Sequence, residues 1–288
     1  MSRMDTTPAR SVEALVRAGV RLLEAHSDSP RLDTELLIAH ALGWSRTALY
    51  ARRSEPLEPA ASARCLELLH ERQTGRPVAQ IVGEREFWSL PLLVTPDVLT
   101  PRPESELLVE RALTHLPEGA TASVLDLGTG SGAVALAIAK ERAAAVVHGT
   151  DVSEAALAVA RQNAARTGLG QVTFSAGDWF AAAAGQYDVI VSNPPYIGET
   201  EWPAVAEALR FEPRTALTSG TDGLDAIRRI VAGSSAFLAP GGWLVLEHGR
   251  GQASAVQALL NGAGFIAVTT ALDLARHPRV TEGQLASA

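Results

Sequence analysis

The chain has 288 residues, of which 47% are hydrophobic and 20% charged, so it has ample apolar material for a buried core and does not read as a disordered protein. Its 25 Lys and Arg residues against 32 Asp and Glu residues give a formal net charge of −7 at pH 7, which argues against a protein that wraps nucleic acid with a basic face. The single cysteine, Cys65, excludes a disulfide framework and a zinc site built from several thiolates.

No stretch of the sequence approaches the roughly 18 consecutive apolar residues that a membrane span needs. Residues 1–10 contain Asp5 and lack the apolar core of a secretory signal. The sequence therefore predicts a soluble, cytoplasmic protein without a membrane partner. Its length allows one large domain or two unequal ones.

The first 75 residues predict helices only. Apolar residues recur at steps of three and four over residues 12–23, 32–41 and 60–72, which places them on one face of each helix. Gly43 and Gly75 follow the second and third segments as stop signals. We expect this three-helix domain, residues 1–75, to recognise a substrate and not to carry the chemistry. Cys65 lies in the third segment and is expected to be a packed, reduced thiol.

Residues 76–103 predict a β-hairpin that links two domains. Short apolar runs from Val78 to Val94 are broken by Gly83 and Pro91, which is typical of strands joined by turns. A helix is then expected to begin at Pro103, because proline suits the first helical turn.

From residue 104 to residue 288 the pattern alternates between strand and helix. Strand cores are expected at residues 124–127, 146–149, 172–174, 189–191 and 243–246, with helices over 133–142, 153–167, 224–238 and 254–260. This alternation predicts an α/β domain whose mostly parallel sheet is covered by helices on both faces.

A glycine-rich loop follows the first strand of this domain. Gly128-Thr129-Gly130-Ser131-Gly132 leads directly into a helix, and glycines there allow the backbone to turn tightly and approach a ligand beside the helix N-terminus. Asp126 lies two residues before the loop. A carboxylate in this position would repel a pyrophosphate but suits a ligand that carries an ammonium and a sulfonium, which favours S-adenosylmethionine over a dinucleotide.

Two further acidic positions follow the next strands. Asp151 ends the second strand, where a carboxylate can accept two hydrogen bonds from a ribose diol, although helix capping is the competing interpretation. Ser153 is an equally good cap, so we favour the ribose role for Asp151. Asp178 and Trp179 follow the third strand and are expected to contact the edge and face of an adenine, with a plain turn and a packed aromatic ring as the alternative.

The segment Asn193-Pro194-Pro195-Tyr196 follows the strand 189–192 and is the most specific signal in the sequence. The prolines fix the backbone, so the Asn193 side-chain oxygen and the Pro194 carbonyl can face one planar NH₂ group. Tyr196 offers a ring for stacking. Two fixed acceptors would also stabilise positive charge that develops on a nitrogen during methyl transfer. An Asn-Pro turn at a strand end is the simpler alternative.

The glycine loop together with Asn193-Pro194-Pro195-Tyr196 resembles the class I S-adenosylmethionine-dependent methyltransferases that act on planar nitrogen. The stretches 83–88, 99–106, 210–213 and 246–249, which read GEREFW, LTPRPESE, RFEP and LEHG, resemble the peptide chain release factor glutamine methyltransferase (PrmC/HemK) family over nearly the whole chain. The chain differs from the family pattern at four positions: Thr100 replaces an aliphatic residue, Ser105 a Thr, Arg276 a glycine, and Glu282 a more apolar residue.

This resemblance implies a Rossmann-like class I methyltransferase domain with a mostly parallel seven-stranded sheet. It also implies methylation of the glutamine side chain in the Gly-Gly-Gln loop of class-1 release factors, which would be the protein partners. We expect the protein itself to be a monomer. Asn193, Pro194 and Tyr196 would be catalytic, and Pro195 would join them in the substrate slot. The residues implied to hold S-adenosylmethionine, with S-adenosylhomocysteine as product, are Asp126, Gly128, Thr129, Gly130, Ser131, Gly132, Asp151, Asp178, Trp179 and Asn193.

Other functions remain open on the residues alone. An exocyclic amine of a nucleic-acid base is also a planar NH₂ group, so a nucleic-acid N-methyltransferase is the main alternative, disfavoured by the net charge. An inactive cofactor-binding interaction protein comes next and is disfavoured by the intact Asn193 segment. The sequence also fits a dinucleotide-dependent oxidoreductase, because Gly128, Gly130 and Ala133 match the dinucleotide-binding motif G-x-G-x-x-G/A. The seven histidines show no metal-ligand spacing, so no metal is expected, and His248 and Glu247 are expected to be structural.

Overall fold

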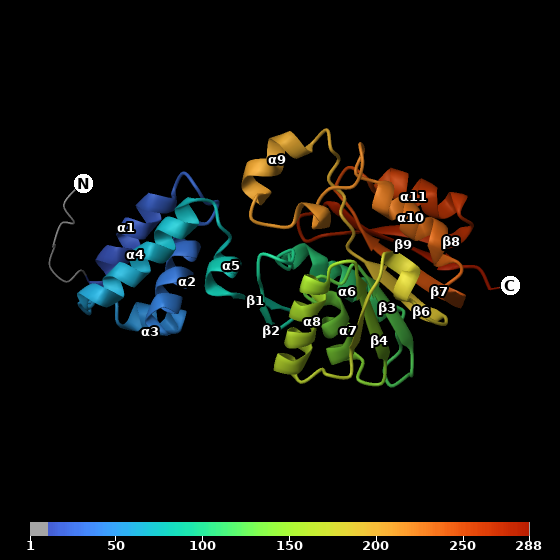
Figure 1. The fold of residues 1–288 in the computed structure, drawn as a ribbon, viewed down its shortest axis with the longest axis horizontal. Coiled ribbons are helices and arrows are strands. Elements are labelled where there is room, and N and C mark those ends of the chain that lie inside the picture. Colours follow the sequence, from blue (N-terminus) through green and yellow to red (C-terminus); the bar gives the residue numbers. More distant parts are fainter. Residues whose placement is uncertain (1–10, 288) are drawn as a thin grey trace. The chain divides into compact units, whose positions relative to one another are not determined.

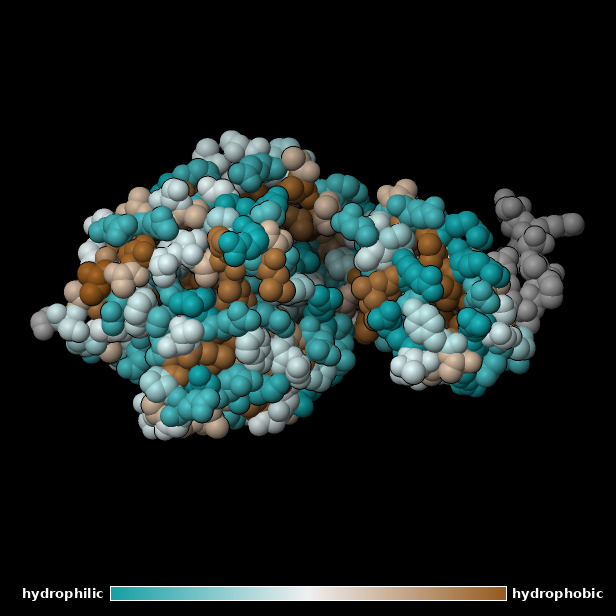
Figure 2. All heavy atoms as spheres, turned by 180° about the vertical axis from the view of Figure 1, so that it is seen from behind, coloured by the Kyte–Doolittle hydropathy of each residue, from teal (hydrophilic) through white to brown (hydrophobic). Residues whose placement is uncertain are grey.

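The computed structural model describes residues 11–287, which form two compact units that divide between Gly83 and Glu84 (Figure 1). Residues 1–10, on which the prediction about a secretory signal rests, lie outside the described part. None of the helices within residues 11–287 combines the length and the apolar character that crossing a membrane requires. On the face shown in Figure 2, hydrophilic residues cover most of the surface and apolar residues form small, separate patches.

The first unit is a bundle of helices. Helix α1 (Val12–Leu23) begins at Ser11, whose side chain accepts a hydrogen bond from the Ala14 N–H. Helices α2 (Pro30–Leu42) and α4 (Pro59–Gln73) correspond to the other two predicted segments, while the short α3 (Arg46–Ala51) was not predicted. A Cβ at Gly19 would lie 2.6 Å from Thr34 Cγ2, so the glycine allows α1 and α2 to approach closely. Cys65 is fully buried, and burial raises the pKa of its thiol to about 11.

The hairpin predicted over residues 76–103 is confirmed only for residues 84–93. Val78–Val82 form a fifth helix, α5, instead of a strand, because Gly83 adopts the left-handed conformation and its N–H closes the turn on the Ala79 carbonyl oxygen at 2.8 Å. The apolar side chains of α5 pack in the first unit, which therefore extends to Gly83 and not only to residue 75. The antiparallel hairpin itself consists of β1 (Glu84–Phe87) and β2 (Leu90–Leu93) and packs in the second unit.

The second unit contains a seven-stranded sheet. Its strands are β3 (Ser123–Leu127), β4 (Val146–Asp151), β5 (Thr173–Ala176), β6 (Tyr187–Ser192), β7 (Leu238–Glu247), β8 (Phe265–Leu272) and β9 (Pro278–Leu285). They lie in the order β5-β4-β3-β6-β7-β9-β8, and β9 alone runs antiparallel to the other strands. The five predicted strands are confirmed, and β8 and β9 complete the sheet.

Helices cover both faces of this sheet, as predicted. Helices α6 (Glu106–Thr114), α7 (Ala133–Glu141) and α8 (Glu154–Thr167) lie on one face, and α10 (Asp225–Ser234) and α11 (Ala253–Gly262) on the other. Along β3, Val124 packs toward α7 while Leu125 packs toward α10, since successive strand residues point to opposite faces. A 3-10 turn, Pro103–Ser105, precedes α6, so the α-helix begins three residues after the predicted start. Helix α9 (Trp202–Leu209) was not predicted.

Glu282 is the polar residue on β9 at a position that is apolar in the family pattern. Only 2% of its surface is exposed. Arg111 of α6 donates hydrogen bonds to both carboxylate oxygens, and His115 Nε2 lies 3.4 Å from Oε2. Burial opposes ionisation, but the nearby His115 and the hydrogen bonds from Arg111 outweigh it and hold the pKa of Glu282 below its usual range. The charged pair replaces the apolar contact expected there.

We predict that Arg111→Met lowers the free energy of unfolding by about 2 kcal/mol at pH 7, because it leaves a buried carboxylate with one hydrogen-bonding partner fewer. Urea denaturation would measure the loss. The matched double variant Arg111→Met/Glu282→Met should recover most of it, since no buried charge remains. Because the pKa of Glu282 is lowered by folding, its contribution should also fade as the pH falls through that lowered value. Equal stability of Arg111→Met and the unmodified protein would contradict this account.

Candidate active site

The candidate site lies where parallel strands of the sheet end together. Backbone pairing places Leu127 at the end of β3 opposite Thr150 on one side and Ser192 on the other, and Ser192 opposite Leu246 of β7. The connection after β3 leads to β4 on one side of β3, whereas the connection after β6 leads to β7 on the opposite side. The loops after β3 and β6 therefore run in opposite directions. In open α/β sheets such a switch in strand order creates a crevice for a ligand.

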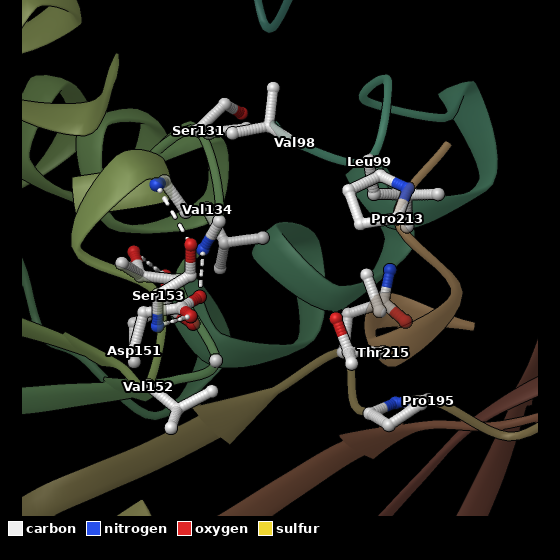
Figure 3. Close-up of a pocket in the computed structure, with 18 of the residues that line it drawn as sticks. Val98, Leu99, Ser131, Val134, Asp151, Val152, Ser153, Pro195, Pro213 and Thr215 are labelled. Carbon is white, nitrogen blue, oxygen red and sulfur yellow. Dashed lines mark hydrogen bonds between the residues drawn. The ribbon is translucent and has the colours of Figure 1, made fainter. Parts of the chain in front are cut away.

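A pocket of about 190 Å³ occupies this crevice. Figure 3 shows Asp151, Val152 and Ser153 on one side of the pocket, and Pro195, Pro213 and Thr215 on the opposite side. The predicted residues that line it are Asp126, Gly128, Thr129, Gly130, Ser131, Asp151, Asp178, Trp179, Asn193 and Pro195. Of the remaining predicted residues, Gly132 caps α7, Pro194 is buried, and Tyr196 lines a second pocket.

The glycine-rich loop is fixed by backbone hydrogen bonds to the end of β4. Gly128, Gly130 and Gly132 have φ values of 71°, 56° and 81°, in the left-handed region that favours glycine. The N–H groups of Gly128 and Thr129 both donate to the Thr150 carbonyl oxygen, at 2.8 and 2.9 Å. The loop therefore presents its backbone to the pocket in one defined conformation.

Asn163 of α8 holds the same loop from behind, although nothing in its helical position indicated this. The side chain is completely buried, and its Nδ2 donates to the Ser131 carbonyl oxygen at 2.9 Å. Its Oδ1 accepts from the Leu93 N–H at 2.7 Å. One amide thus joins the hairpin end to the glycine loop.

Asp151 holds two backbone groups at the pocket and keeps lone pairs for a ligand. Its Oδ2 accepts a hydrogen bond from the Gly130 N–H at 2.9 Å, and its Oδ1 accepts one from the Ser153 N–H at 2.9 Å. The Ser153 hydroxyl is the cap of α8, since it accepts from the Ala156 N–H. Each carboxylate oxygen of Asp151 keeps a second lone pair, so the group can still accept hydroxyl hydrogens from a ligand in the pocket.

Asp126 is a buried acid at the floor of the pocket, with 2% of its surface exposed. Burial raises the pKa of its carboxyl to about 7, against the opposing effect of hydrogen bonds from the Thr129 hydroxyl and the Ala135 N–H. The charge of Asp151 raises it further. A positively charged ligand nearby would favour the ionised form of Asp126.

The charge of the pocket lining discriminates between classes of ligand. Its described residues include Asp97, Asp126, Asp151 and Asp178 and no Lys, Arg or His. Such a lining fits a ligand with an ammonium and a sulfonium and disfavours one with a pyrophosphate, which needs hydrogen-bond donors and positive charge. The residues present therefore fit S-adenosylmethionine.

Asp178 and Trp179 line the pocket in different ways. Arg229 of α10 donates a 2.6 Å hydrogen bond to Asp178 Oδ2. Asp178 therefore lines the pocket and also forms an ion pair with Arg229 on the surface. Trp179 has a φ of 54°, an unusual conformation for a bulky residue. A Cβ at Gly128 would lie 3.7 Å from the Trp179 ring, so the ring lies over the start of the glycine loop.

The Asn193 segment runs along the opposite side of the pocket from Asp151. Asn193 Nδ2 donates a 3.0 Å hydrogen bond to the Ser105 hydroxyl oxygen, which leaves Oδ1 as the acceptor that remains available. The Tyr196 carbonyl oxygen accepts from Gln252 Nε2 at 3.0 Å, which fixes the end of the segment. Burial raises the pKa of the Tyr196 phenol to about 12, so the ring is a neutral surface at physiological pH.

Two segments that the sequence marked only as family-like form the wall that contains Pro213. Glu212 is buried and accepts a 3.0 Å hydrogen bond from the Thr100 N–H and a further one from Arg102. This joins residues 99–102 to residues 210–213 and places Leu99 and Pro213 at the pocket. The sequence did not reveal this contact. The one available signal was an acid between apolar residues, Phe211 and Pro213.

Two further sequence expectations concern histidines and metals. His248 is buried, with Nδ1 2.9 Å from the Gly249 carbonyl oxygen and Nε2 2.8 Å from the Thr281 hydroxyl, as expected for a structural residue. Burial lowers its pKa. Among residues 11–287, no group of three or more His, Cys, Asp or Glu side chains is arranged to hold a metal ion.

We predict that Asp151→Asn weakens binding of S-adenosylhomocysteine roughly 30-fold, because about 2 kcal/mol of charge-assisted hydrogen bonding is lost. Isothermal titration would measure it. The matched control is Ser153→Ala, which removes the cap of α8 and about 1 kcal/mol of stability but should leave affinity within about twofold. Equal losses of affinity in both variants would reduce Asp151 to a helix-terminus residue.

We also predict that affinity for S-adenosylhomocysteine rises about tenfold between pH 6 and pH 8. Below pH 7 the Asp126 carboxyl is largely protonated and offers no charge to the ligand ammonium, whereas above pH 7 it is ionised. Titrations at several pH values would show the trend, and Asp126→Asn should remove it. A flat profile in the unmodified protein would refute the assignment.

Comparison with known proteins identifies the family of this chain. The family described as PrmC N-terminal domain matches residues 13–83, and the one described as Methyltransferase small domain matches residues 103–224. A release factor glutamine methyltransferase of Burkholderia pseudomallei is 51% identical over 294 residues, which cover 99% of this chain and 99% of that protein. One of Xylella fastidiosa is 49% identical over 255 residues, covering 88% of this chain and 93% of that protein.

Among solved structures, a methyltransferase from Pyrococcus furiosus aligns with a TM-score of 0.53 at 20% identity, over 68% of this chain and 89% of that chain. At this identity the likeness concerns the fold, and it confirms the predicted methyltransferase architecture. The sequence identity to the curated relatives extends over nearly the whole length of both chains. The chain belongs to the release factor glutamine methyltransferase family.

Proposed function

We propose that this protein transfers a methyl group from S-adenosylmethionine to the side-chain amide nitrogen of the glutamine in the Gly-Gly-Gln loop of class-1 release factors. The observation that carries the proposal is the position of Asn193, whose available amide oxygen lies at the switch in strand order beside an acidic pocket. Family membership supports the same activity. No observation favours a nucleic-acid substrate or an inactive protein.

The chain's own residues would bind and orient the cofactor. Asp151 would accept the ribose hydroxyls, Asp126 would face the positive charge, and the fixed backbone of residues 128–132 would lie against the ligand. Trp179 and Val152 would enclose the adenine, since both line the pocket and Val152 is largely exposed there. When bound, S-adenosylmethionine supplies an electrophilic methyl group on a sulfonium.

The substrate amide would be held by two acceptors and an aromatic wall. Asn193 Oδ1 and the Pro194 carbonyl oxygen would each accept one hydrogen of the planar NH₂ group, and Tyr196 would line the slot. An amide nitrogen is a poor nucleophile because its lone pair is delocalised. Acceptors that strengthen as positive charge develops on this nitrogen lower the barrier without a strong base. Holding the substrate nitrogen in a fixed orientation toward the methyl group lowers the barrier further.

The helical unit would serve recognition of the release factor. The predicted division was a recognition domain (residues 1–75), a linker (76–103) and a catalytic domain (104–288), and in this proposal the recognition domain runs to Gly83. Since release factors act in translation, we place the activity in the cytoplasm, and we propose that the protein acts as a monomer.

The decisive experiment is incubation with methyl-labelled S-adenosylmethionine and a class-1 release factor. Label is expected in the release factor that carries Gln in its Gly-Gly-Gln loop. The matched control is the same factor with that Gln replaced by Ala, which should stay unlabelled. Labelling of both factors, or labelling of an oligonucleotide with none of the release factor, would overturn the proposal.

We predict that Asn193→Ala reduces kcat by roughly 10³-fold, because one of the two acceptors that face the developing charge is lost. Single-turnover transfer of label would measure this. Binding of S-adenosylhomocysteine should remain measurable in the variant, which separates substrate orientation from folding. Methyl transfer at the unmodified rate would rule out the two-acceptor arrangement.

A further inference from the structure

The orientation of the Asn193 amide depends on a residue outside its own segment. The Ser105 hydroxyl oxygen accepts the 3.0 Å hydrogen bond from Asn193 Nδ2, although the two residues are 88 positions apart. Ser105 is 4% exposed and ends the 3-10 turn before α6. A hydroxyl can donate or accept, so this contact alone does not decide which end of the amide faces the substrate.

A second neighbour of Ser105 determines which end of the Asn193 amide faces the substrate. The carboxylate of Glu247, which is 1% exposed at the end of β7, lies close enough to accept a hydrogen bond from the Ser105 hydroxyl. Glu247 Oε2 is buried without a hydrogen-bond partner among the described residues. Sheet pairing explains the contact: Ser192 lies opposite Leu246, so the next residues, Asn193 and Glu247, leave adjacent strands side by side.

The order of donors and acceptors follows from the charge on Glu247. An ionised carboxylate can only accept, so the single hydrogen of the Ser105 hydroxyl must point toward Glu247. Ser105 then has only lone pairs to offer Asn193, which must present Nδ2 to Ser105 and Oδ1 to the substrate. A protonated Glu247 could instead donate to Ser105, and the hydroxyl would be free to donate to Asn193 Oδ1. The amide would then present an NH₂ group to the NH₂ group of the substrate.

We propose that Ser105 and Glu247 are positioning residues, in which the buried carboxylate orients the Ser105 hydroxyl and thereby keeps Asn193 Oδ1 directed at the substrate amide. This inference rests on the proposed function of the site. Neither residue needs to touch the substrate or the cofactor for this role. Both act through the direction of one hydroxyl hydrogen.

The charges that face Glu247 come from three neighbouring segments. Burial raises the pKa of its carboxyl to about 7, and the hydrogen bond from Ser105 and the charge of Arg279 on β9 lower it in part. Glu104 raises it and Arg102 lowers it, both from the segment before α6. Tyr196 adjoins it from the loop after β6, and the carboxylate raises the pKa of that phenol. The orienting charge is therefore present above about pH 7 and is lost as the pH falls below it.

The first test compares three residues at position 105. Ser105→Ala removes the hydroxyl and should lower kcat roughly 10–100-fold, because the amide of Asn193 can then turn. Ser105→Thr keeps a hydroxyl and should retain kcat within about threefold of the unmodified protein. Affinity for S-adenosylhomocysteine should stay within about threefold in both variants, which shows that the pocket is intact.

The second test is the pH dependence of kcat between pH 5.5 and pH 8.5. The unmodified protein should lose activity on the acid side with an apparent pKa near that of Glu247, about 7. Glu247→Gln has the same shape and no charge, so it should show a lower kcat at pH 8 and no acid limb. Its midpoint of thermal unfolding should not fall, since the variant buries no charge.

The proposal stands if Ser105→Ala loses activity, Ser105→Thr retains it and Glu247→Gln loses the acid limb. Any other combination overturns it. If Ser105→Ala fails to fold, the pH profile of the isosteric Glu247→Gln decides alone. Failure of the unmodified protein to label a release factor would instead refute the proposed function, which keeps the two conclusions separate.

Discussion

The backbone register of the parallel strands is the constraint on which the site depends. Pairing of β3 with β4 and β6, and of β6 with β7, places the ends of four strands at one edge of the sheet. Residues far apart in the chain, such as Asp126, Asp151 and Asn193, lie within one position of those ends and therefore meet in one crevice. A shift of one strand by a single residue would turn its side chains to the opposite face and separate them. Apolar packing on both faces of the sheet prevents such a shift.

The electrostatics of the site divide between two kinds of buried acid. Asp126 faces the pocket without a cationic side chain in the described lining, so its charge is available to a ligand. Glu212 and Glu282 are instead paired with Arg102 and Arg111 and hold loops and strands in place. A buried carboxylate that lacks a cation costs stability, and proteins retain such groups mainly where a function requires them. This contrast supports the proposed role of Asp126 in ligand binding, whereas Glu212 and Glu282 maintain the fold.

Sequence patterns predicted the parts of the protein whose structure is determined by residues close together in the chain. The strands and the loops after them follow from apolar runs and glycines, so the sheet and the residues 126–132, 151 and 193–196 could be located. The five-residue helix α5 could not, because so short an apolar run also fits a strand. Ser105, Asn163 and Glu212 were missed for another reason: their partners lie 88, 70 and 112 positions away, and no spacing in the chain records which buried groups will face each other.

The hydrogen bond between Glu212 and the Thr100 N–H has a consequence for folding during synthesis on the ribosome. The wall of the pocket stays open until residue 212 has left the exit tunnel, and β6 gains its neighbour β7 only after residue 247 has followed. Contacts of such long sequence separation form slowly, since loop closure must precede them. The helical unit, complete by Gly83, can fold while the rest is still being synthesised. The nascent chain would thus possess a recognition module well before it possesses a working site.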